Sequence, residues 1–350
     1  MSSSSFLPTN PRYLITGGAG FIGSNFIHQL LREEPECSIV NLDKLNYAGN
    51  LANLDDVAGD ERYRFVKGDI GDARLVEGLI ESTTIVVNFA AETHVDRSIL
   101  DPLSFITTDV MGTGVLLEAF RKKGGRRFLH ISTDEVYGSI DQGFFREEDP
   151  INPSSPYSAS KAGGDRLAYS YFVTYGLPVI IARPSNTFGP YQYPEKAIPL
   201  FSTNALDDHS LPLYGDGKNV RDWLFVEDLC RGLRLLIQKA EPGKAYNLGG
   251  GNELQNRDLI RKILHILGKP ESLIQPVKDR LGHDRRYALD SSRARSLGWT
   301  PSTSFDQAIE ATVRWYADHR PWWEAIKLKS EDYKQYYQTQ YGADKKQESR

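Results

Sequence analysis

The sequence has 350 residues, of which 40% are hydrophobic, so it is long enough to bury one large core or two ordinary ones. Its 42 lysine and arginine residues are outnumbered by 46 aspartate and glutamate residues; the resulting net charge of -4 excludes a global positive field that would hold a nucleic-acid backbone. The two cysteines, Cys37 and Cys230, match no metal-ligand spacing, which predicts a protein of a reducing compartment without a metal site.

The two ends of the chain carry no targeting pattern. The first ten residues have neither the basic region nor the long apolar region of a secretory signal. No apolar run approaches the roughly 18 residues that cross a membrane. We therefore expect a cytoplasmic protein with no membrane partner, in which residues 1–9 and 342–350 are flexible tails.

The first half of the chain alternates short apolar runs with longer amphipathic segments. Continuous apolar runs are typical of strands that are buried on both faces of a parallel sheet, and apolar residues at helical spacing indicate helices between them. Repeated units of this kind predict an α/β fold with a doubly wound, Rossmann-type parallel sheet. The predicted strands are 13–16, 38–43, 63–69, 84–90, 127–133 and 178–184, and the predicted helices include 24–33, 72–81 and 113–123.

This rhythm breaks after Pro184. The chain becomes rich in Pro, Gly and Tyr, with helical patterns over 226–240 and 256–267. Irregular segments of this length are usually functional or disordered, and their aromatic content argues against disorder. We predict a smaller, mixed α/β lobe that binds the substrate. The first lobe is assigned 10–185 and 220–249, and the second 186–219 and 250–341.

A glycine-rich turn follows the first predicted strand. Its spacing, Gly17-x-x-Gly20-x-x-Gly23, differs slightly from the usual dinucleotide fingerprint, and a helix is predicted to start near Ser24. Such a turn lets the backbone approach a pyrophosphate at the positive end of the helix. A merely tight turn between strand and helix is the alternative. The predicted dinucleotide contacts are Gly17, Gly20, Phe21, Ile22 and Gly23.

The second predicted strand ends in an acidic residue, Asp43, twenty residues after the last glycine of that turn. A carboxylate at this place accepts hydrogen bonds from a ribose 2'-hydroxyl and repels a 2'-phosphate, which favours NAD over NADP. Lys44 follows directly and weakens that preference. Asp69, at the end of the third strand, is placed either to meet the adenine, together with Ile70, or to serve as a turn residue.

Tyr157 and Lys161 are four residues apart at the start of a predicted helix, so they share one face. A nearby ammonium stabilises a phenolate and lowers the pKa of the phenol, which would let Tyr157 take a proton from an alcohol while hydride leaves for NAD. An ordinary amphipathic pair is the alternative, since this spacing also occurs by chance.

A polar run, Ser132 to Glu135, follows the fifth predicted strand. Side chains at the carboxyl ends of strands in an open sheet face the ligand crevice, although Ser-Thr-Asp is also a capping pattern. Thr133 is placed to hydrogen-bond the substrate oxygen. Asp134 and Glu135 exceed what alcohol oxidation needs, and adjacent carboxylates repel, so that one can stay protonated. An acid and a base together favour oxidation, elimination of water and re-reduction.

With these motifs the chain resembles the dTDP-glucose 4,6-dehydratases within the extended short-chain dehydrogenase/reductases, from Arg12 to about Tyr341. The glycine turn, Ser132-Thr133 and the Tyr-x-x-x-Lys pair mark only the superfamily. More specific are LDKLNYAGN (42–50), AAETHVDRS (90–98), STDEVYG (132–138) and DRLGHDRRYALD (279–290), together with YQYPEKAIP (191–199) and RDWLFVEDL (221–229).

The resemblance implies a dTDP-linked hexose beside a tightly held NAD, oxidised at C4 with Tyr157 as base. Glu135 would take the C5 proton and Asp134 would protonate the departing C6 hydroxyl. It also implies a homodimer formed through the helix that carries Tyr157 and the helix over 113–123. Further contacts to NAD are assigned to Lys44, Asp69, Ile70, Ala90, Ala91 and Thr93.

Further contacts to the nucleotide sugar follow from the same resemblance. They are assigned to His94, the residue in this group most readily explained as structural, and to Asn186, Glu195, Lys196, Arg221, Asn256, Arg280 and His283. A diphosphate needs local cations in a net acidic protein, although each Arg alone is more often an ion-paired surface group. The chain departs from the family pattern at Thr187-Phe188, where Asn-Tyr is common, and at Ala197 after the Glu-Lys pair.

Three hypotheses remain open at this point. The dehydration of dTDP-glucose is the first, with the same reaction on another nucleotide hexose such as UDP-glucose as a variant. A sugar-nucleotide 4-epimerase would share the NAD site, Thr133, Tyr157 and Lys161, and the Asp134-Glu135 pair argues against it. An inactive NAD-sensing protein would have no need of these five side chains.

Overall fold

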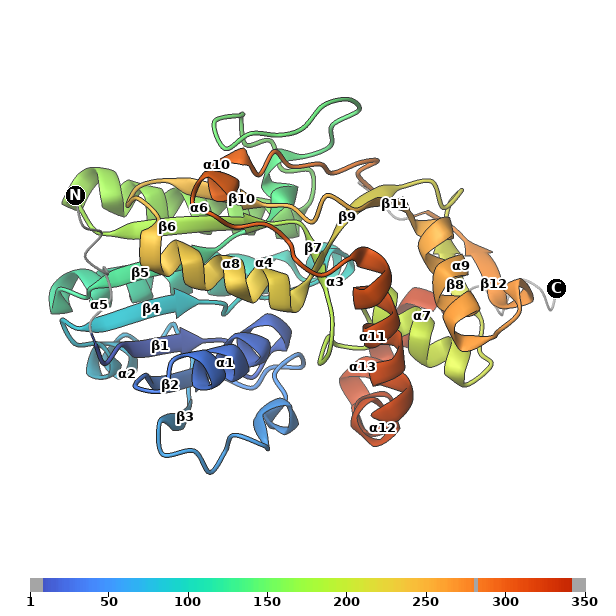
Figure 1. Cartoon of the computed structure of the whole chain (residues 1–350), viewed down its shortest axis with the longest axis horizontal. Helices are drawn as coiled ribbons and strands as arrows, with labels where there is room; N and C mark the ends of the chain where they lie inside the picture. The colour runs from blue at the N-terminus through green and yellow to red at the C-terminus, as the bar shows by residue number, and fades with distance from the viewer. Residues whose placement is uncertain (1–8, 280–282, 342–350) are drawn as a thin grey trace.

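The computed structural model describes residues 9–279 and 283–341 (Figure 1). A seven-stranded sheet of order β10-β6-β5-β4-β1-β2-β3 forms the first lobe. Every neighbouring pair in it is parallel. The strands are β1 (Arg12–Thr16), β2 (Ser38–Asp43), β3 (Tyr63–Lys67), β4 (Thr84–Asn88), β5 (Arg127–Ile131), β6 (Val179–Pro184) and β10 (Ala245–Leu248).

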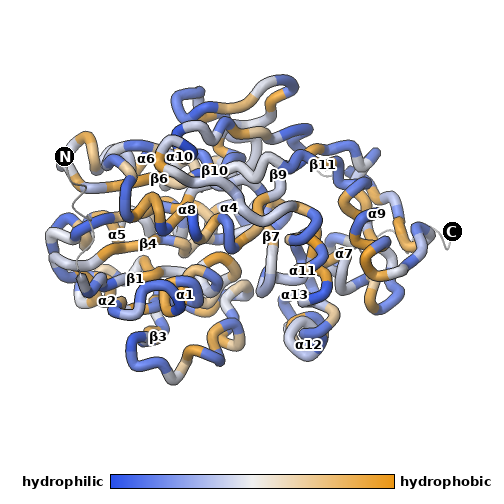
Figure 2. The backbone as a smooth tube through the Cα atoms, in the orientation of Figure 1, coloured by the Kyte–Doolittle hydropathy of each residue, from blue (hydrophilic) through white to orange (hydrophobic). Residues whose placement is uncertain are grey.

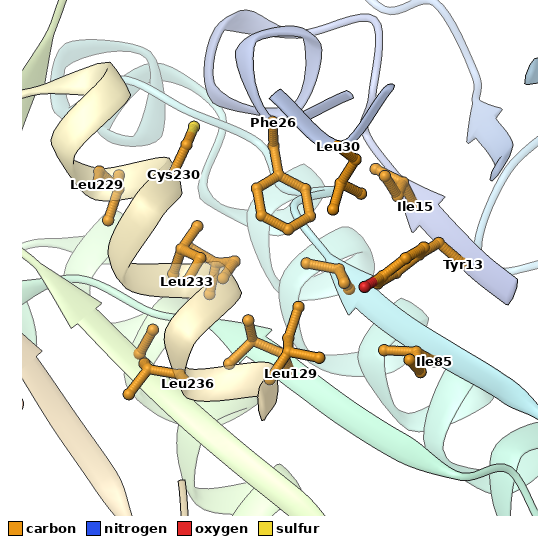
Figure 3. Close-up of a cluster of buried hydrophobic side chains, with 14 of the residues drawn as sticks. Tyr13, Ile15, Phe26, Leu30, Ile85, Leu129, Leu229, Cys230, Leu233 and Leu236 are labelled. Carbon is orange, nitrogen blue, oxygen red and sulfur yellow. The ribbon is translucent and has the colours of Figure 1, made fainter. Parts of the chain in front are cut away.

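Helices cover both faces of this sheet. On one face α1 (Phe21–Glu33) packs beside α8 (Val226–Lys239), and Figure 3 shows Phe26 and Leu30 of α1 opposite Leu233 of α8. On the other face lie α2 (Ala73–Leu79), α5 (Thr113–Lys123) and α6 (Pro156–Tyr175). The predicted doubly wound α/β fold is confirmed. Figure 2 shows hydrophobic stretches along inner strands such as β4, as burial on both faces requires.

One long helix of the first lobe is unusually apolar. The segments α4 (Pro102–Phe105), η2 (Ile106–Gly112, π-helical) and α5 run on without a break. By length and composition this helix could cross a membrane, but half of its most apolar window is buried, mainly against α2 and α6. A half-buried helix of this kind is typical of a protein core.

The second lobe has its own core. It contains a three-stranded sheet of order β11-β9-β7 and a parallel pair, β12-β8. These strands are β7 (Asn186–Phe188), β8 (Leu211–Tyr214), β9 (Val220–Phe225), β11 (Glu253–Gln255) and β12 (Ile274–Val277). They pack with α7 (Ala197–Leu206), α9 (Asn256–Leu267) and α11 (Phe305–Asp318). The described part of the chain then ends in α12 (Arg320–Lys329) and α13 (Glu331–Tyr341).

The chain passes between the two lobes more than once. β10 joins the large sheet and α8 packs on it, as the assignment of 220–249 to the first lobe requires, but β9 pairs with β7 and β11. The exact domain boundaries stay a prediction. Short elements complete the described chain: η1 (Leu51–Leu54), α3 (Val95–Leu100), η3 (Asp134–Tyr137), η4 (Glu271–Leu273) and α10 (Ser292–Ser296).

Candidate active site

A cavity of about 410 Å³ lies between the lobes, at the carboxyl ends of the parallel strands. Ligands bind at this edge of open α/β sheets. Nearly all the predicted site residues line it. From the NAD set these are Gly17, Gly20, Phe21, Ile22, Gly23, Asp43, Lys44, Ile70, Ala90, Ala91 and Thr93; from the rest they are His94, Thr133, Asp134, Glu135, Tyr157, Lys161, Asn186, Glu195, Lys196, Arg221, Asn256 and His283.

The glycine turn is too tightly packed for side chains at two of its glycines. Gly17 has φ +70°, and a Cβ there would lie 2.7 Å from the backbone nitrogen of Ala90. A Cβ on Gly23 would lie 2.4 Å from the Gly17 carbonyl oxygen. Helix α1 begins at Phe21, so the predicted start near Ser24 is three residues late; Gly20 is the N-cap and offers no side chain as a signal. The open N-terminus of α1 faces the cavity, and the turn fits a dinucleotide pyrophosphate.

Two charged residues, Asp43 at the end of β2 and Lys44 directly after it, bear on whether the site accepts a ribose 2'-hydroxyl or a 2'-phosphate. The Asp43 carboxylate accepts from the backbone nitrogens of Ala19 at 2.9 Å and Leu45 at 2.8 Å, which fixes its direction. Lys44 Nζ lies 2.8 Å from Glu92 Oε1. Because Glu92 neutralises Lys44, a 2'-phosphate would meet the negative charge of Asp43 without a compensating cation from Lys44. The structure therefore removes the reservation about NAD that Lys44 raised.

Asp69 is the exception among the described NAD residues. Gly68 and Ile70 line the cavity, but Asp69 does not. Its Oδ1 accepts from the backbone nitrogen of Gly71 at 2.8 Å, and its other oxygen lies 3.9 Å from Lys44 Nζ. Asp69 therefore makes the contact of a turn residue, and its contact with the adenine stays a prediction.

Some cavity residues were not predicted. Glu92 and Thr108 line the cavity beside Lys44, and Asn46 donates to Glu92 Oε2 at 3.1 Å. Glu92 stands between Ala91 and Thr93 in a stretch already assigned to NAD, so its position in that motif was a usable signal. Thr108 had none, because the π-helical segment that turns it inward has no recognisable sequence pattern.

Helix α6, which carries Tyr157 and Lys161, begins at a capping box. The Ser155 hydroxyl accepts a hydrogen bond from the backbone nitrogen of Ser158, and the Ser158 hydroxyl accepts one from the backbone nitrogen of Ser155. A proline occupies the first turn of the helix. Tyr157 and Lys161 both face the cavity from this helix. The Lys161 ammonium donates to the carbonyl of Ile131 at the end of β5, at 2.7 Å.

The pKa of Tyr157 is raised, whereas the sequence predicted a lowered pKa. Burial raises the pKa of Tyr157 well above its ordinary value. Glu135, Asp109 and Asp134 raise that pKa further because a nearby negative charge disfavours a phenolate. Burial also lowers the pKa of Lys161. The prediction that Lys161 lowers the pKa of Tyr157 in the chain alone is therefore wrong, because desolvation and three carboxyl groups dominate at this depth.

The sequence left two alternatives for the segment of Thr133 and Asp134: side chains that face the ligand crevice, or a capping pattern. Both are found at Thr133. Thr133 is the N-cap of η3, and its hydroxyl accepts from the backbone nitrogen of Glu135 at 3.3 Å and donates to Asp134 Oδ1 at 3.1 Å. Thr133 and Tyr157 line the same cavity. One side chain therefore both caps the turn and reaches the cavity.

The two adjacent carboxyl groups have different surroundings. Burial, and next the neighbouring Glu135, raise the pKa of Asp134 well above its ordinary value, and Asp134 is 2% exposed. Glu135 is only partly buried. The pair therefore combines a buried carboxyl group of raised pKa at Asp134 with a more solvated carboxyl group at Glu135, as an acid and a base in one site require.

The second lobe supplies further polar groups to the wall of the cavity. Lys196 Nζ donates to Thr93 Oγ1 at 3.0 Å. Arg221 donates to the carbonyls of Val220 at 2.8 Å and Asp284 at 3.0 Å. His283 Nδ1 lies 2.6 Å from Asp279 Oδ1. The wall is completed by Asn186, Glu195 and Asn256, while Arg280 lies outside the described residues.

His94 has an unusual backbone for a structural residue. Its φ is +87° at the N-cap of α3, and its Nδ1 lies 3.8 Å from Asp96 Oδ2. Strained non-glycine residues cluster at functional sites. This backbone favours His94 as a wall residue of the site.

Comparison with known proteins gives a consistent relationship. Residues 14–312 match the family model described as GDP-mannose 4,6 dehydratase. A dTDP-glucose 4,6-dehydratase of Streptomyces antibioticus is 52% identical over 320 residues, which cover 90% of this chain and 95% of that one.

Solved structures agree with the sequences. DesIV of Streptomyces venezuelae, a dTDP-glucose 4,6-dehydratase with NAD and dTDP bound, superposes with a TM-score of 0.88 at 51% identity, over 90% of this chain and 100% of that one. A UDP-glucose 4-epimerase of Thermus thermophilus with NAD is more distant, with a TM-score of 0.81 and 30% identity over 88% of this chain and 99% of that one. The chain belongs to the dTDP-glucose 4,6-dehydratase family of the extended short-chain dehydrogenase/reductases.

Proposed function

We propose that the protein converts dTDP-glucose into dTDP-4-keto-6-deoxyglucose. The observation that carries this proposal is the pair Asp134 and Glu135 beside Tyr157, in one cavity with the glycine turn. An epimerase needs the phenol and the cofactor but has no step for an acid and base pair. The relatives at about 50% identity that are named dTDP-glucose 4,6-dehydratases support the same reaction.

The side chains divide the reaction among them. The glycine turn would hold NAD, which would supply a hydride acceptor for C4 of the hexose and a hydride donor for C6. Tyr157, which lines the cavity with Thr133, takes the proton of the C4 hydroxyl, and Lys161 supplies a positive charge beside it. Glu135 removes the C5 proton, whose acidity the new C4 ketone raises. Asp134 donates the proton with which the C6 hydroxyl leaves as water.

The test uses the purified protein with dTDP-glucose and no added reductant. We expect a product that has lost one water per molecule and that absorbs in alkali as a 4-keto sugar. Recovery of dTDP-galactose would instead show an epimerase. Parallel reactions with UDP-, CDP- and GDP-glucose test the base preference, which we propose to be thymidine. A UDP-glucose rate that equals or exceeds the dTDP-glucose rate would contradict this preference.

We also propose a homodimer through α5 and α6, which pack against each other. Large apolar side chains remain exposed on α4, on η2 and on α6: Leu103 is 75% exposed, Met111 64% and Val173 62%. We propose that they form one apolar surface, and such a surface usually marks an interface. It would also cover the exposed half of the long apolar helix.

Met111→Glu is expected to convert the dimer into a monomer, because it places a charge in the interface. Light scattering behind a sizing column measures the mass. The control is Leu328→Glu, since Leu328 is 65% exposed on α12, away from this face. A wild-type protein with the mass of one chain would refute the proposal.

The cytoplasm is the compartment we propose. Cys37 and Cys230 are both buried free thiols, so the fold needs no oxidising environment. Fractionation of the source cells, with the protein recovered outside the soluble intracellular fraction, would contradict this assignment.

A further inference from the structure

Three of the dehydratase-specific stretches of the sequence meet at one guanidinium group. Tyr47 comes from LDKLNYAGN, Arg97 from AAETHVDRS and Glu195 from YQYPEKAIP. Neither Tyr47 nor Arg97 lines the cavity, and the proposed reaction gives neither a role. Arg97 is nevertheless the contact that joins these segments.

The Arg97 side chain is held on four sides and is 15% exposed. Its Nε donates to Glu195 Oε2 at 2.9 Å. Its two terminal nitrogens donate to the two carboxylate oxygens of Asp332 on α13, at 3.1 and 2.7 Å. The guanidinium also lies over the rings of Tyr47 and Tyr336, with its carbon 3.6 and 4.7 Å from the ring centroids. Paired hydrogen bonds and two ring faces fix an arginine more firmly than a single ion pair does.

This arrangement reaches the cavity through the neighbour of Glu195. The Glu195 side chain is fully buried, and Lys196 follows it directly. Lys196 donates to Thr93 Oγ1 at 3.0 Å inside the cavity, where it faces the charge of Glu135. The Tyr47 hydroxyl donates to the Thr93 carbonyl at 2.6 Å. Contacts that start at Arg97 therefore fix both Lys196 and its partner.

The helix that completes the arrangement lies beyond the match to the GDP-mannose 4,6 dehydratase family model. The family match ends at residue 312, whereas α13 begins at Glu331. Asp332, Tyr336 and Gln340 are four residues apart on one face of α13. Tyr336 packs on Arg97 and His94, and Gln340 donates to Tyr214, a cavity residue, at 2.7 Å. This face of α13 supports the wall of the cavity.

We propose that Arg97 and Asp332 are positioning residues that hold Lys196 at the reacting end of the cavity, so that α13 is a working part of the active site. The proposal rests on the proposed dehydration only for the choice of assay substrate. Displacements of about 1 Å at a reacting centre cost about 100-fold in rate. A contact far from the substrate can therefore have a large effect.

The test compares neighbouring residues of α13. Asp332→Asn is expected to lower kcat/KM for dTDP-glucose about tenfold, and Arg97→Met about 100-fold. Glu331→Gln is the matched control, because Glu331 is adjacent to Asp332 and its side chain is 86% exposed. It pairs with Lys334 on the surface, at 2.7 Å. This control is expected to stay within about twofold of wild type. NAD content and the thermal midpoint of Asp332→Asn should equal those of the control.

A double-variant cycle separates positioning from general loosening. If Asp332 acts through Lys196, then Asp332→Asn has no further effect in a Lys196→Met background. The same fold loss in both backgrounds would overturn the proposal, as would an Asp332→Asn protein that matches Glu331→Gln.

Failure of the proposed function gives a different result. In that case the wild-type protein itself leaves dTDP-glucose unchanged. Calorimetric affinities for dTDP-glucose then replace kcat/KM in the same comparison, and the same pattern among the variants decides the role of Arg97 and Asp332.

Discussion

Replacing Glu135 by glutamine is expected to lower the turnover of dTDP-glucose about 1,000-fold while NAD and substrate still bind. The amide is almost isosteric but cannot accept the C5 proton. Tyr157, Thr133 and Lys161 remain in place, so oxidation at C4 can still occur. The enzyme should therefore stop with the cofactor reduced, before elimination.

Two measurements follow this variant. Absorbance of reduced nicotinamide after mixing with dTDP-glucose should rise and persist, and solvent deuterium should not enter at C5. Asp134→Asn is the matched control, because it removes the acid and keeps the base: it should exchange C5 hydrogen while elimination is slow. Unchanged turnover of Glu135→Gln would remove Glu135 from the mechanism.

The substitution Arg183→Met is expected to lower the free energy of unfolding by about 3–5 kcal/mol. Arg183 on β6 is 1% exposed and donates to both carboxylate oxygens of Asp165 on α6, at 2.8 and 3.0 Å. Asp165 is fully buried on the same helix as Tyr157 and Lys161. Without Arg183 this carboxylate would lose its buried partner, and the penalty for burying its charge would remain.

Urea unfolding measures this loss. Lys262→Met is the control, since Lys262 pairs with the exposed Asp306 and should cost less than about 1 kcal/mol. Adding Asp165→Leu to Arg183→Met should restore most of the stability, because two apolar side chains then replace the pair. A loss no larger than that of the control would contradict a stabilising role for the buried pair.

The pair also predicts how stability depends on pH. Arg183 holds the pKa of Asp165 down at about 2, below the value of about 3.9 for an unfolded aspartate. A lowered folded pKa stabilises the fold above roughly pH 4, and this contribution disappears as the pH falls towards 2. The Arg183→Met protein should lack this acid-side slope.

The fold could be predicted from the sequence because its signals are local. Apolar runs and helical spacing located the strands and helices of the large sheet, and the glycine turn marked the first crossover. The start of α1 was misplaced because its N-cap, Gly20, has no side chain. At Ser155 the opposite holds, because the side chains of the capping box mark the start of α6 in the sequence.

The site was predictable as a set of residues but not as a set of interactions. The ion pair of Lys44 with Glu92 and the contact of Arg97 with Asp332 join residues that are 48 and 235 positions apart. No periodicity reports such contacts. The pKa of Tyr157 was misjudged for a related reason: the spacing to Lys161 was visible, whereas the depth of burial and the carboxyl groups around the phenol depend on the folded chain.

The two buried cysteines make the chain a convenient background for site-specific labelling. Burial raises the pKa of Cys37 to about 11 and raises that of Cys230 as well, so neither thiol forms much of the reactive thiolate at neutral pH. A cysteine introduced at the exposed Gln338 of α13 would therefore be the preferred target of a thiol-reactive dye. The movements of this helix could then be followed by fluorescence without first removing the native cysteines.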